Sequence, residues 1–212
     1  MPRGSPATTM PPAPLRRRPT AAAALCAVAA LTAVAAVAQP VDVWQPIGPQ
    51  GATVLSLTRD PLDSSTVWIG CHFGGLYRSD DAGASWTHIP TAFSGESVTA
   101  IEILPTTPRT IYVASIKSGV YRSIDGGATW QSRSVGLDDP VVRDLAIDPT
   151  APSRLLAATF SGVYVSDDAG ASWTLATTDQ PFLPATSLLF DPTDPAVVYA
   201  GSQGLGVFRS LD

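Results

Sequence analysis

The stretch Ser79-Asp80-Asp81-Ala82-Gly83-Ala84-Ser85-Trp86 decides the fold, because nearly the same eight residues return twice further along the chain. The second copy, at 123–130, reads Ser-Ile-Asp-Gly-Gly-Ala-Thr-Trp, and the third, at 166–173, reads Ser-Asp-Asp-Ala-Gly-Ala-Ser-Trp. The copies begin 44 and 43 residues apart, and a further Ser-x-Asp begins 44 residues later at Ser210. Such a period indicates a repeat architecture. We call the eight-residue motif the box.

Each period holds four short apolar segments separated by turn residues, and their alternation and β-branched content predict strands. The third segment opens on Gly-x-aromatic and runs into the box, and the fourth leaves from the box Trp. We expect the second segment to be the most buried. The first and second segments are, in chain order, 54–58 and 67–70, 98–103 and 111–114, 142–147 and 155–158, 187–190 and 198–201. Four antiparallel strands in 43 or 44 residues, without helices, match one blade of a β-propeller.

The predicted fold class is therefore all-β, a β-propeller of about four blades, each a four-stranded antiparallel sheet. The predicted blades cover residues 51–90, 97–134, 140–177 and 185–212. Residues 43–48 look like an outer strand without a blade of its own, and the last blade lacks an outer strand. Trp44 could thus complete a split box with Ser210 and Asp212. Residues 43–47 would then pair with the third strand near Phe208 and close a ring. The alternative is a segment of a larger propeller, whose open blade edges would favour self-association.

The box resembles the Asp-box, or bacterial neuraminidase repeat, of sialidases, sortilin-type receptors, xyloglucanase-like glycosidases and photosystem II assembly factors. Its chemistry suits a tight turn, because a carboxylate can accept backbone N–H groups and Gly permits positive φ. The Trp can then cover the turn. We therefore expect a structural role, and neither catalysis nor metal binding, for Ser79, Asp81, Gly83, Trp86, Ser123, Asp125, Gly127, Trp130, Ser166, Asp168, Gly170 and Trp173.

The N-terminal region has the pattern of an export signal. Three arginines at 16–18 precede residues 21–38, an uncharged run mostly of Ala, Leu and Val that ends in Ala36-Val37-Ala38. We predict that residues 1–38 are a signal peptide and that 39–212 are the mature propeller. The expected location is secreted or periplasmic, with no stable membrane anchor after cleavage.

The composition of the mature part restricts its partners. Residues 39–212 contain 9 basic and 18 acidic side chains, and such a negative charge repels phosphate backbones. We expect no nucleic-acid partner. The two histidines lack a third ligand at metal-binding spacing, so neither a metal nor a cofactor is predicted.

The binding face is predicted where the repeats differ. The loops between the second and third strands vary from blade to blade, and variable loops on a repeated scaffold commonly carry binding. These loops lie on the face of the propeller at one end of its central channel, which we call the channel face. We expect this face to contact an unidentified protein or glycan. The candidate residues are His72, Phe73, Lys117, Phe160 and Gln203.

Enzymatic activity is the less favoured interpretation. Glycosidases need two carboxyl groups at the scissile bond. The resemblance to xyloglucanase-like enzymes implies a catalytic Asp shortly before Gly74-Gly75-Leu76-Tyr77-Arg78, but His72 stands there. Glu96 with Asp138 or Asp139 remains an alternative acid pair, and the Arg-Ile-Pro segment of sialidases is absent.

We therefore interpret the chain as an exported, non-catalytic binding or assembly scaffold. Part of a xyloglucanase-like or sialidase-like glycoside hydrolase is the first alternative. A sortilin-like peptide-binding module is the second.

Overall fold

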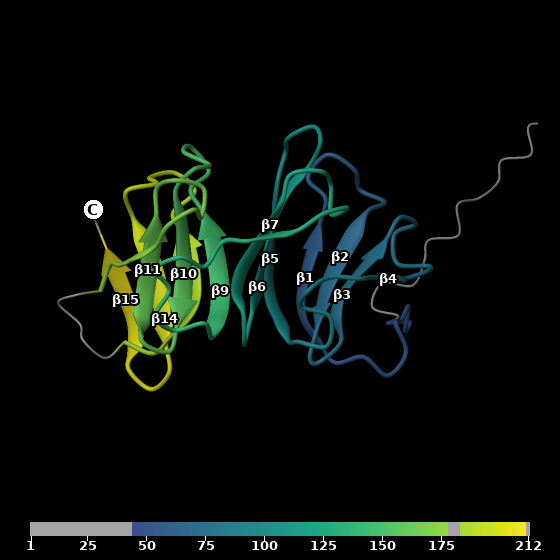
Figure 1. The fold of residues 1–212 in the computed structure, drawn as a ribbon, viewed down its shortest axis with the longest axis horizontal. Helices are drawn as coiled ribbons and strands as arrows, with labels where there is room; N and C mark the ends of the chain where they lie inside the picture. Colours follow the sequence, from purple (N-terminus) through teal and green to yellow (C-terminus); the bar gives the residue numbers. More distant parts are fainter. Residues whose placement is uncertain (1–43, 178–182, 211–212) are drawn as a thin grey trace, which may run out of the picture. The chain divides into compact units, whose positions relative to one another are not determined.

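The computed structural model describes residues 44–177 and 183–210, which form fifteen strands in four antiparallel sheets (Figure 1). The first sheet contains β1 (Val54–Arg59), β2 (Val67–Cys71), β3 (Gly75–Ser79) and β4 (Thr87–Ile89). The second contains β5 (Val98–Leu104), β6 (Thr110–Ser115), β7 (Gly119–Ser123) and β8 (Gln131–Ser132). The third contains β9 (Val142–Ile147), β10 (Leu155–Thr159), β11 (Gly162–Ser166) and β12 (Thr174–Leu175). The fourth contains β13 (Ala185–Phe190), β14 (Val198–Ser202) and β15 (Gly206–Ser210).

Each sheet follows the chain without crossovers, so every strand pairs with its neighbours in sequence. This arrangement confirms the predicted all-β propeller built from antiparallel blades, which we number 1 to 4. No helix in the described ranges is long and apolar enough to cross a membrane. The predicted signal peptide, residues 1–38, lies outside the described part of the chain.

The strands of all four blades pair in the same register, and the same irregularity recurs in each blade. The first strand of each blade has a bulge just after its first residue, for example between Val54 and Ser56 and between Val98 and Ala100. A bulge leaves one residue out of the ladder and increases the local twist. The second strands β6 and β10 are buried along their whole length, as expected, whereas β14 is only partly buried.

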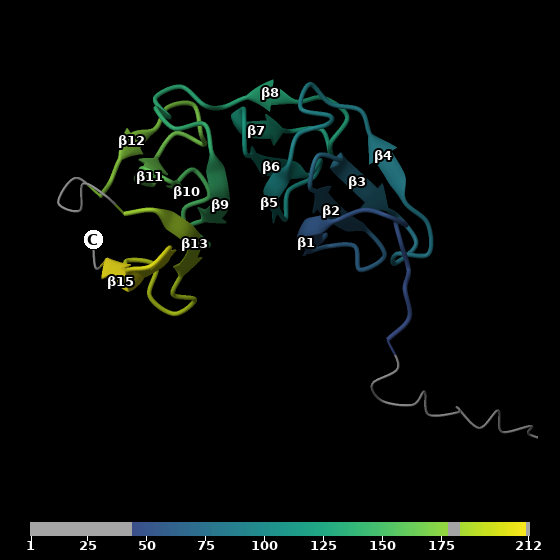
Figure 2. The ribbon, with the colours of Figure 1, turned by 90° about the horizontal axis from the view of Figure 1, so that it is seen from below.

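Successive blades pack face to face, chiefly through their first strands (Figure 2). Because side chains alternate along a strand, each blade has a forward face toward the next blade and a backward face toward the preceding one. Trp68 and Leu76 on the forward face of blade 1 pack with Val98, Ile101 and Val113 on the backward face of blade 2. Equivalent apolar clusters join blade 2 to blade 3 and blade 3 to blade 4.

Polar contacts between first strands supplement this packing. The Ser56 hydroxyl donates to the carbonyl of Val98, and the Thr99 hydroxyl donates to that of Val142, one blade later. The Asp144 carboxylate accepts the N–H of Leu188 at 2.7 Å. Each blade therefore fixes the backbone of the next one.

The expected outer strand over 43–48 does not form. Residues 44–47 have no strand structure, and the described sheet of blade 4 ends at β15. Instead of lying near Phe208, Ile47 lies against the first box, where its carbonyl accepts the indole N–H of Trp86 at 2.9 Å. The termini therefore do not close blade 4 in this molecule. Val43 and Asp212 lie outside the described residues.

Candidate functional site

Each box forms a hydrogen-bonded turn between the third and fourth strands of its blade. In the first box the Asp81 carboxylate accepts the Ser85 N–H at 2.8 Å, the Ser85 hydroxyl at 2.6 Å and the Ser79 hydroxyl at 2.8 Å. The Ser79 hydroxyl accepts the N–H of Gly83, whose φ is +93°. The boxes around Asp125 and Asp168 repeat this pattern.

The charge state of the box carboxylates follows from these bonds. The hydroxyl of Ser85, Thr129 or Ser172, followed by the N–H of the same residue, lowers the pKa of Asp81, Asp125 and Asp168 to about 2. Such a group is ionised at neutral pH, and a general acid needs a pKa near the working pH. The described residues also include no group of three or more His, Cys, Asp or Glu placed to hold a metal ion.

The box tryptophans connect neighbouring parts of the chain. The indole N–H of Trp173 donates to the carbonyl of Arg133 in the preceding blade at 2.7 Å, just as Trp86 donates to Ile47. Trp130 instead donates to Gly127 of its own box at 3.1 Å.

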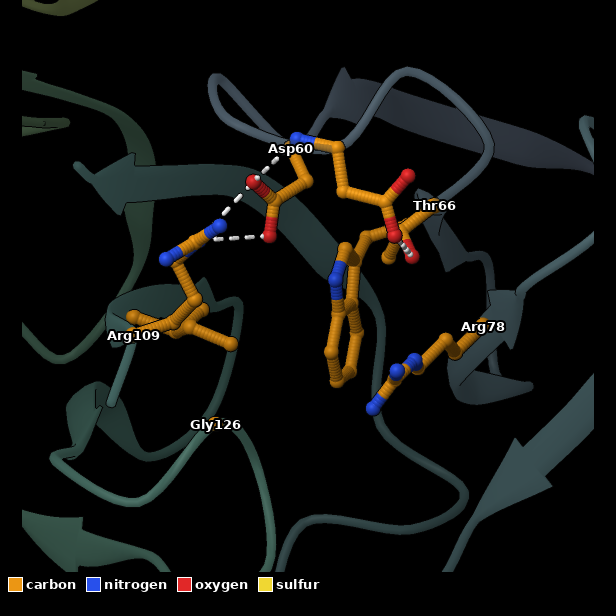
Figure 3. A pocket seen from close by; sticks show the side chains of 8 residues that line it. Asp60, Thr66, Arg78, Arg109 and Gly126 are labelled. Atoms are coloured by element: carbon orange, nitrogen blue, oxygen red, sulfur yellow. Dashed lines mark hydrogen bonds and ion pairs between the residues drawn. The ribbon is translucent and has the colours of Figure 1, made fainter. Parts of the chain in front are cut away.

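A pocket of about 220 Å³ lies at the box end of blades 1 and 2 (Figure 3). The Asp60 carboxylate accepts the Arg109 Nε–H on both oxygens at 2.8 Å, which joins the two blades across the pocket. Burial opposes ionisation of Asp60, but hydrogen bonds from Arg109 and from the turn outweigh it and lower its pKa. The Arg78 guanidinium lies 5.3 Å from the centre of the Trp68 ring on the other wall. An ion pair that joins two blades lines this pocket, so we assign it a structural role.

The opposite end of the blades carries the loops between the second and third strands, which we call the loop face. Phe73 lies there in the loop of blade 1, 62% exposed, with a φ of +52°. A bulky residue rarely adopts such a backbone conformation, and surrounding contacts must hold it. The Ser97 hydroxyl from the start of blade 2 does so, accepting the Phe73 N–H at 3.1 Å and bonding His72 Nδ1 at 2.9 Å.

The Phe73 ring has an aromatic and a cationic neighbour. The His72 ring centre lies 4.0 Å from it, and Lys117 Nζ from the loop of blade 2 lies 5.9 Å from it. A cation at this distance from a ring face is attracted by the ring quadrupole. The structure therefore brings three of the five candidate residues together: His72, Phe73 and Lys117.

The other two candidate residues lie on the loops of blades 3 and 4. Phe160 is 43% exposed, and the Arg143 guanidinium lies 5.5 Å from its ring centre. Gln203 is exposed, and its backbone N–H donates to the carbonyl of Pro184. The loop face thus presents a second aromatic and cationic pair, at Phe160 and Arg143, which sequence reasoning only half recognised.

Two members of the alternative acid pair, Glu96 and Asp139, are hydrogen-bonded within loops. Both oxygens of Glu96 accept serine hydroxyls at 2.6 Å, from Ser115 and Ser118, and so shape the loop of blade 2. Asp139 accepts the N–H of Val141 and of Ser161 and so shapes the loop of blade 3. Hydrogen bonding therefore commits these two carboxylates to different loops.

A different pair of acids was missed by sequence reasoning. Burial, and then the charge of Asp144, raises the pKa of Glu102 to about 7. Burial also raises the pKa of Asp144. Glu102 lies on β5 and Asp144 on β9, so the interaction crosses from blade 2 to blade 3. The two residues are 42 positions apart, close to the repeat period, and that spacing was the one available signal.

The comparison with protein families identifies the chain. Residues 74–179, half of its length, match the family described as Sortilin-Vps10, with sortilin and neurotensin receptor 3. The chain belongs to the Sortilin-Vps10 family. The matched segment runs from the loop of blade 1 to the end of blade 3, so the three complete boxes lie inside it. No curated protein matches the chain.

Three of the solved structures similar to this Sortilin-Vps10 member are propellers of longer chains. An ancestral GH74 enzyme matches with 24% identity and a TM-score of 0.62, over 80% of this chain and 24% of its own. YCF48 from Cyanidioschyzon merolae matches with 16% identity and a TM-score of 0.52, over 78% and 58%. A structure of YCF48 bound to D1 peptide matches with 20% identity and a TM-score of 0.52, over 75% and 50%. This chain thus spans about a quarter of the GH74 enzyme, and these likenesses concern the fold alone.

Proposed function

We propose that this protein is an exported, non-catalytic scaffold of Asp-box repeats that binds an extended polypeptide on its loop face. The observation that carries the proposal is Phe73, an exposed aromatic ring held at positive φ by Ser97. An exposed side chain whose backbone is fixed by its surroundings loses less conformational freedom on binding, which favours affinity. Exposed apolar side chains that gather on one surface also mark interaction sites.

The charges near the rings favour a ligand with acidic or carbonyl groups. Lys117 and Arg143 each lie beside an exposed ring of the loop face, on a chain whose net charge is −5. A peptide could place an apolar side chain on Phe73 or Phe160 and a carboxylate or carbonyl near the adjacent cation. The family name includes a receptor, and one similar structure holds a bound peptide, which supports this ligand class.

The geometry of the acids favours binding over turnover. Glu96 and Asp139 are committed to loop hydrogen bonds, and the box carboxylates have pKa values of about 2. His72, which stands where the resemblance implies an acid, is bonded to Ser97.

The test is peptide selection on the purified protein from a random-peptide library, followed by titration of the selected peptides. Phe73→Ala should weaken binding about tenfold or more, as removal of a central aromatic contact commonly does. Leu62→Ala is the matched control, because Leu62 is also exposed but lies in a turn at the box end. A library that yields no binder, or binders insensitive to Phe73→Ala, would contradict the proposal.

Glycoside hydrolysis is the second candidate, favoured by Gly74-Gly75-Leu76-Tyr77-Arg78 and by the GH74 likeness. Xyloglucan and sialosides are its probes. Release of reducing sugar or sialic acid that disappears in Glu96→Gln or Asp139→Asn would establish it and overturn the non-catalytic proposal.

A further inference from the structure

The backward face of blade 1 exposes apolar side chains that the other blades bury. Leu57 on β1 is 68% exposed, whereas the residues at the same place in blades 2 and 3, Ile101 and Leu145, are 3% and 2% exposed. Val54 is likewise exposed, and its counterpart Val98 is buried. This face therefore has the composition of an interface but no blade against it.

The forward face of blade 4 shows the same contrast. Val207 on β15 is 73% exposed, whereas its counterparts Leu76 and Val120 in blades 1 and 2 are fully buried. Leu189 on β13 is exposed, and its counterpart in blade 3, Ala146, is buried.

These two surfaces are the two halves of one interface that the chain already makes three times. In each apolar cluster between blades, the forward face of one blade packs against the backward face of the next. The forward face of blade 4 therefore fits the backward face of blade 1 by the same residue positions. Both faces are exposed in this molecule, so they are not packed on each other within it.

The segment 44–47 supplies the missing outer strand of the same interface. Trp44-Gln45-Pro46-Ile47 aligns with Trp130-Gln131-Ser132-Arg133, which contains β8. The carbonyl of Ile47 accepts the indole N–H of Trp86, just as the carbonyl of Arg133 accepts the indole N–H of Trp173. The segment therefore already lies where the outer strand of a preceding blade would end. In blade 2, Arg133 also donates its N–H to Val120 at 2.7 Å, and Gln131 pairs with Arg122.

We propose that two copies of this chain associate head to tail, each placing the forward face of its blade 4 on the backward face of the other's blade 1. The segment 44–47 of each copy pairs with β15 of the other. By analogy with blade 2, Gln45 then lies opposite Arg209, and Ile47 donates its N–H to Val207. Each contact joins two different faces and is therefore heterologous. The assembly closes into a ring when each of the two copies uses both of its faces. The result has eight blades, within the usual propeller range.

A second copy is the occupant that the surfaces favour. The interface it would form continues the one between blades of this chain, with the same side-chain positions and the same outer-strand pairing. An unrelated protein would have to reproduce all of these features.

The proposal is tested by the molar mass of the protein purified from cells expressing the full 212-residue chain, measured by light scattering over a range of concentrations. Twice the mass of one mature chain is expected. Leu57→Asp and Val207→Asp should each reduce the mass to that of one chain. Both side chains are exposed in the single chain, so these variants should fold, which circular dichroism checks. Leu62→Asp, at a leucine that is 60% exposed and lies outside both faces, should leave the mass unchanged.

Mixing the two monomeric variants tests the head-to-tail geometry. A Leu57→Asp copy retains its blade 4 face and a Val207→Asp copy retains its blade 1 face, so one intact contact can form between them. The mixture should therefore contain pairs that neither variant forms alone. A wild-type protein of single-chain mass at all concentrations would overturn the proposal, as would a dimer insensitive to both substitutions or a mixture without pairs.

Discussion

The indole N–H of Trp173 donates a 2.7 Å hydrogen bond to the backbone carbonyl of Arg133, one blade earlier in the chain. Trp173 is buried, and the backbone of Gly136 lies directly against it. The box of blade 3 is therefore joined by a side chain to the residue that follows β8 in blade 2, in addition to the packing of the first strands.

Replacing Trp173 by Phe should lower the free energy of unfolding by about 1–3 kcal/mol, because a partly buried carbonyl loses its donor and the volume of a buried ring shrinks. Urea denaturation measures this change. Trp130→Phe is the matched comparison, since the Trp130 indole bonds only within its own box, and its effect should be smaller. Equal effects would show that the contact between blades adds nothing.

Replacing Asp125 by Ala should lower the melting temperature by several degrees, because the N–H of Thr129 and two hydroxyls lose their acceptor. Asp125→Asn, which keeps one acceptor oxygen, should lose less. Differential scanning calorimetry compares the three proteins, and unchanged melting in Asp125→Ala would contradict a structural role for the box.

The box carboxylates also predict the response to acid. Their pKa in the folded protein is about 2, below the ordinary value of 3.8, so their stabilising contribution is complete above pH 4. It is lost as the pH falls from about 4 toward 2, because the unfolded chain binds protons first. Unfolding followed between pH 5 and 2 should show this loss, and Asp125→Asn should reduce its slope.

The raised pKa of Glu102 predicts the opposite pH dependence of stability, at higher pH. Its pKa is about 7 in the folded protein against 4.5 ordinarily, so the folded state holds the proton more tightly. Stability should therefore fall as the pH rises from about 4.5 to 7. Glu102→Gln should remove this slope and gain about 1–3 kcal/mol relative to wild type at pH 8. Denaturant titrations at pH 4.5 and 8 provide the measurement, and parallel curves for both proteins would refute the assignment.

The ion pair in the pocket of Figure 3 should contribute measurably to stability. Arg109→Met removes the partner of a nearly buried carboxylate and should cost about 1–3 kcal/mol. Arg78→Met breaks an ion pair with the exposed Asp80, and such pairs contribute about 0–1 kcal/mol. Similar losses in both variants would show that the connection between blades through Asp60 is unimportant.

The blade could be predicted from the sequence because its determinants are local. Each box places the acceptor, the glycine and the tryptophan within eight residues, and the apolar segments between boxes alternate as strands do. The outer strand predicted over 43–48 has no strand structure in its described part, residues 44–48. Its alignment with β8 is sound, but strand structure requires a partner strand, and β15 does not lie beside it in this molecule.

The candidate site could be predicted less completely. Phe73 could be predicted because it is an aromatic residue in a loop that differs from blade to blade. Its positive φ, however, depends on Ser97 in the next blade. The Glu102 and Asp144 interaction depends on how two first strands face each other. Contacts between residues a whole period apart need the geometry of blade packing, which sequence patterns within one blade do not contain.

The hydrogen bonds of each box stay within its own blade, apart from that of the tryptophan, and this affects how such a chain can change in length. The bonds made by the Ser79 and Asp81 side chains join residues of the motif no more than four positions apart. The N–H of Ala82 donates outside the motif, to Ser65, but within the same blade. Duplicating or deleting one whole period would therefore carry each turn along intact and preserve the pairing of faces on either side. A change of any other length inside a strand or a box would separate a turn from its strands. We therefore expect tolerated insertions and deletions outside the loops to come in steps of 43 or 44 residues.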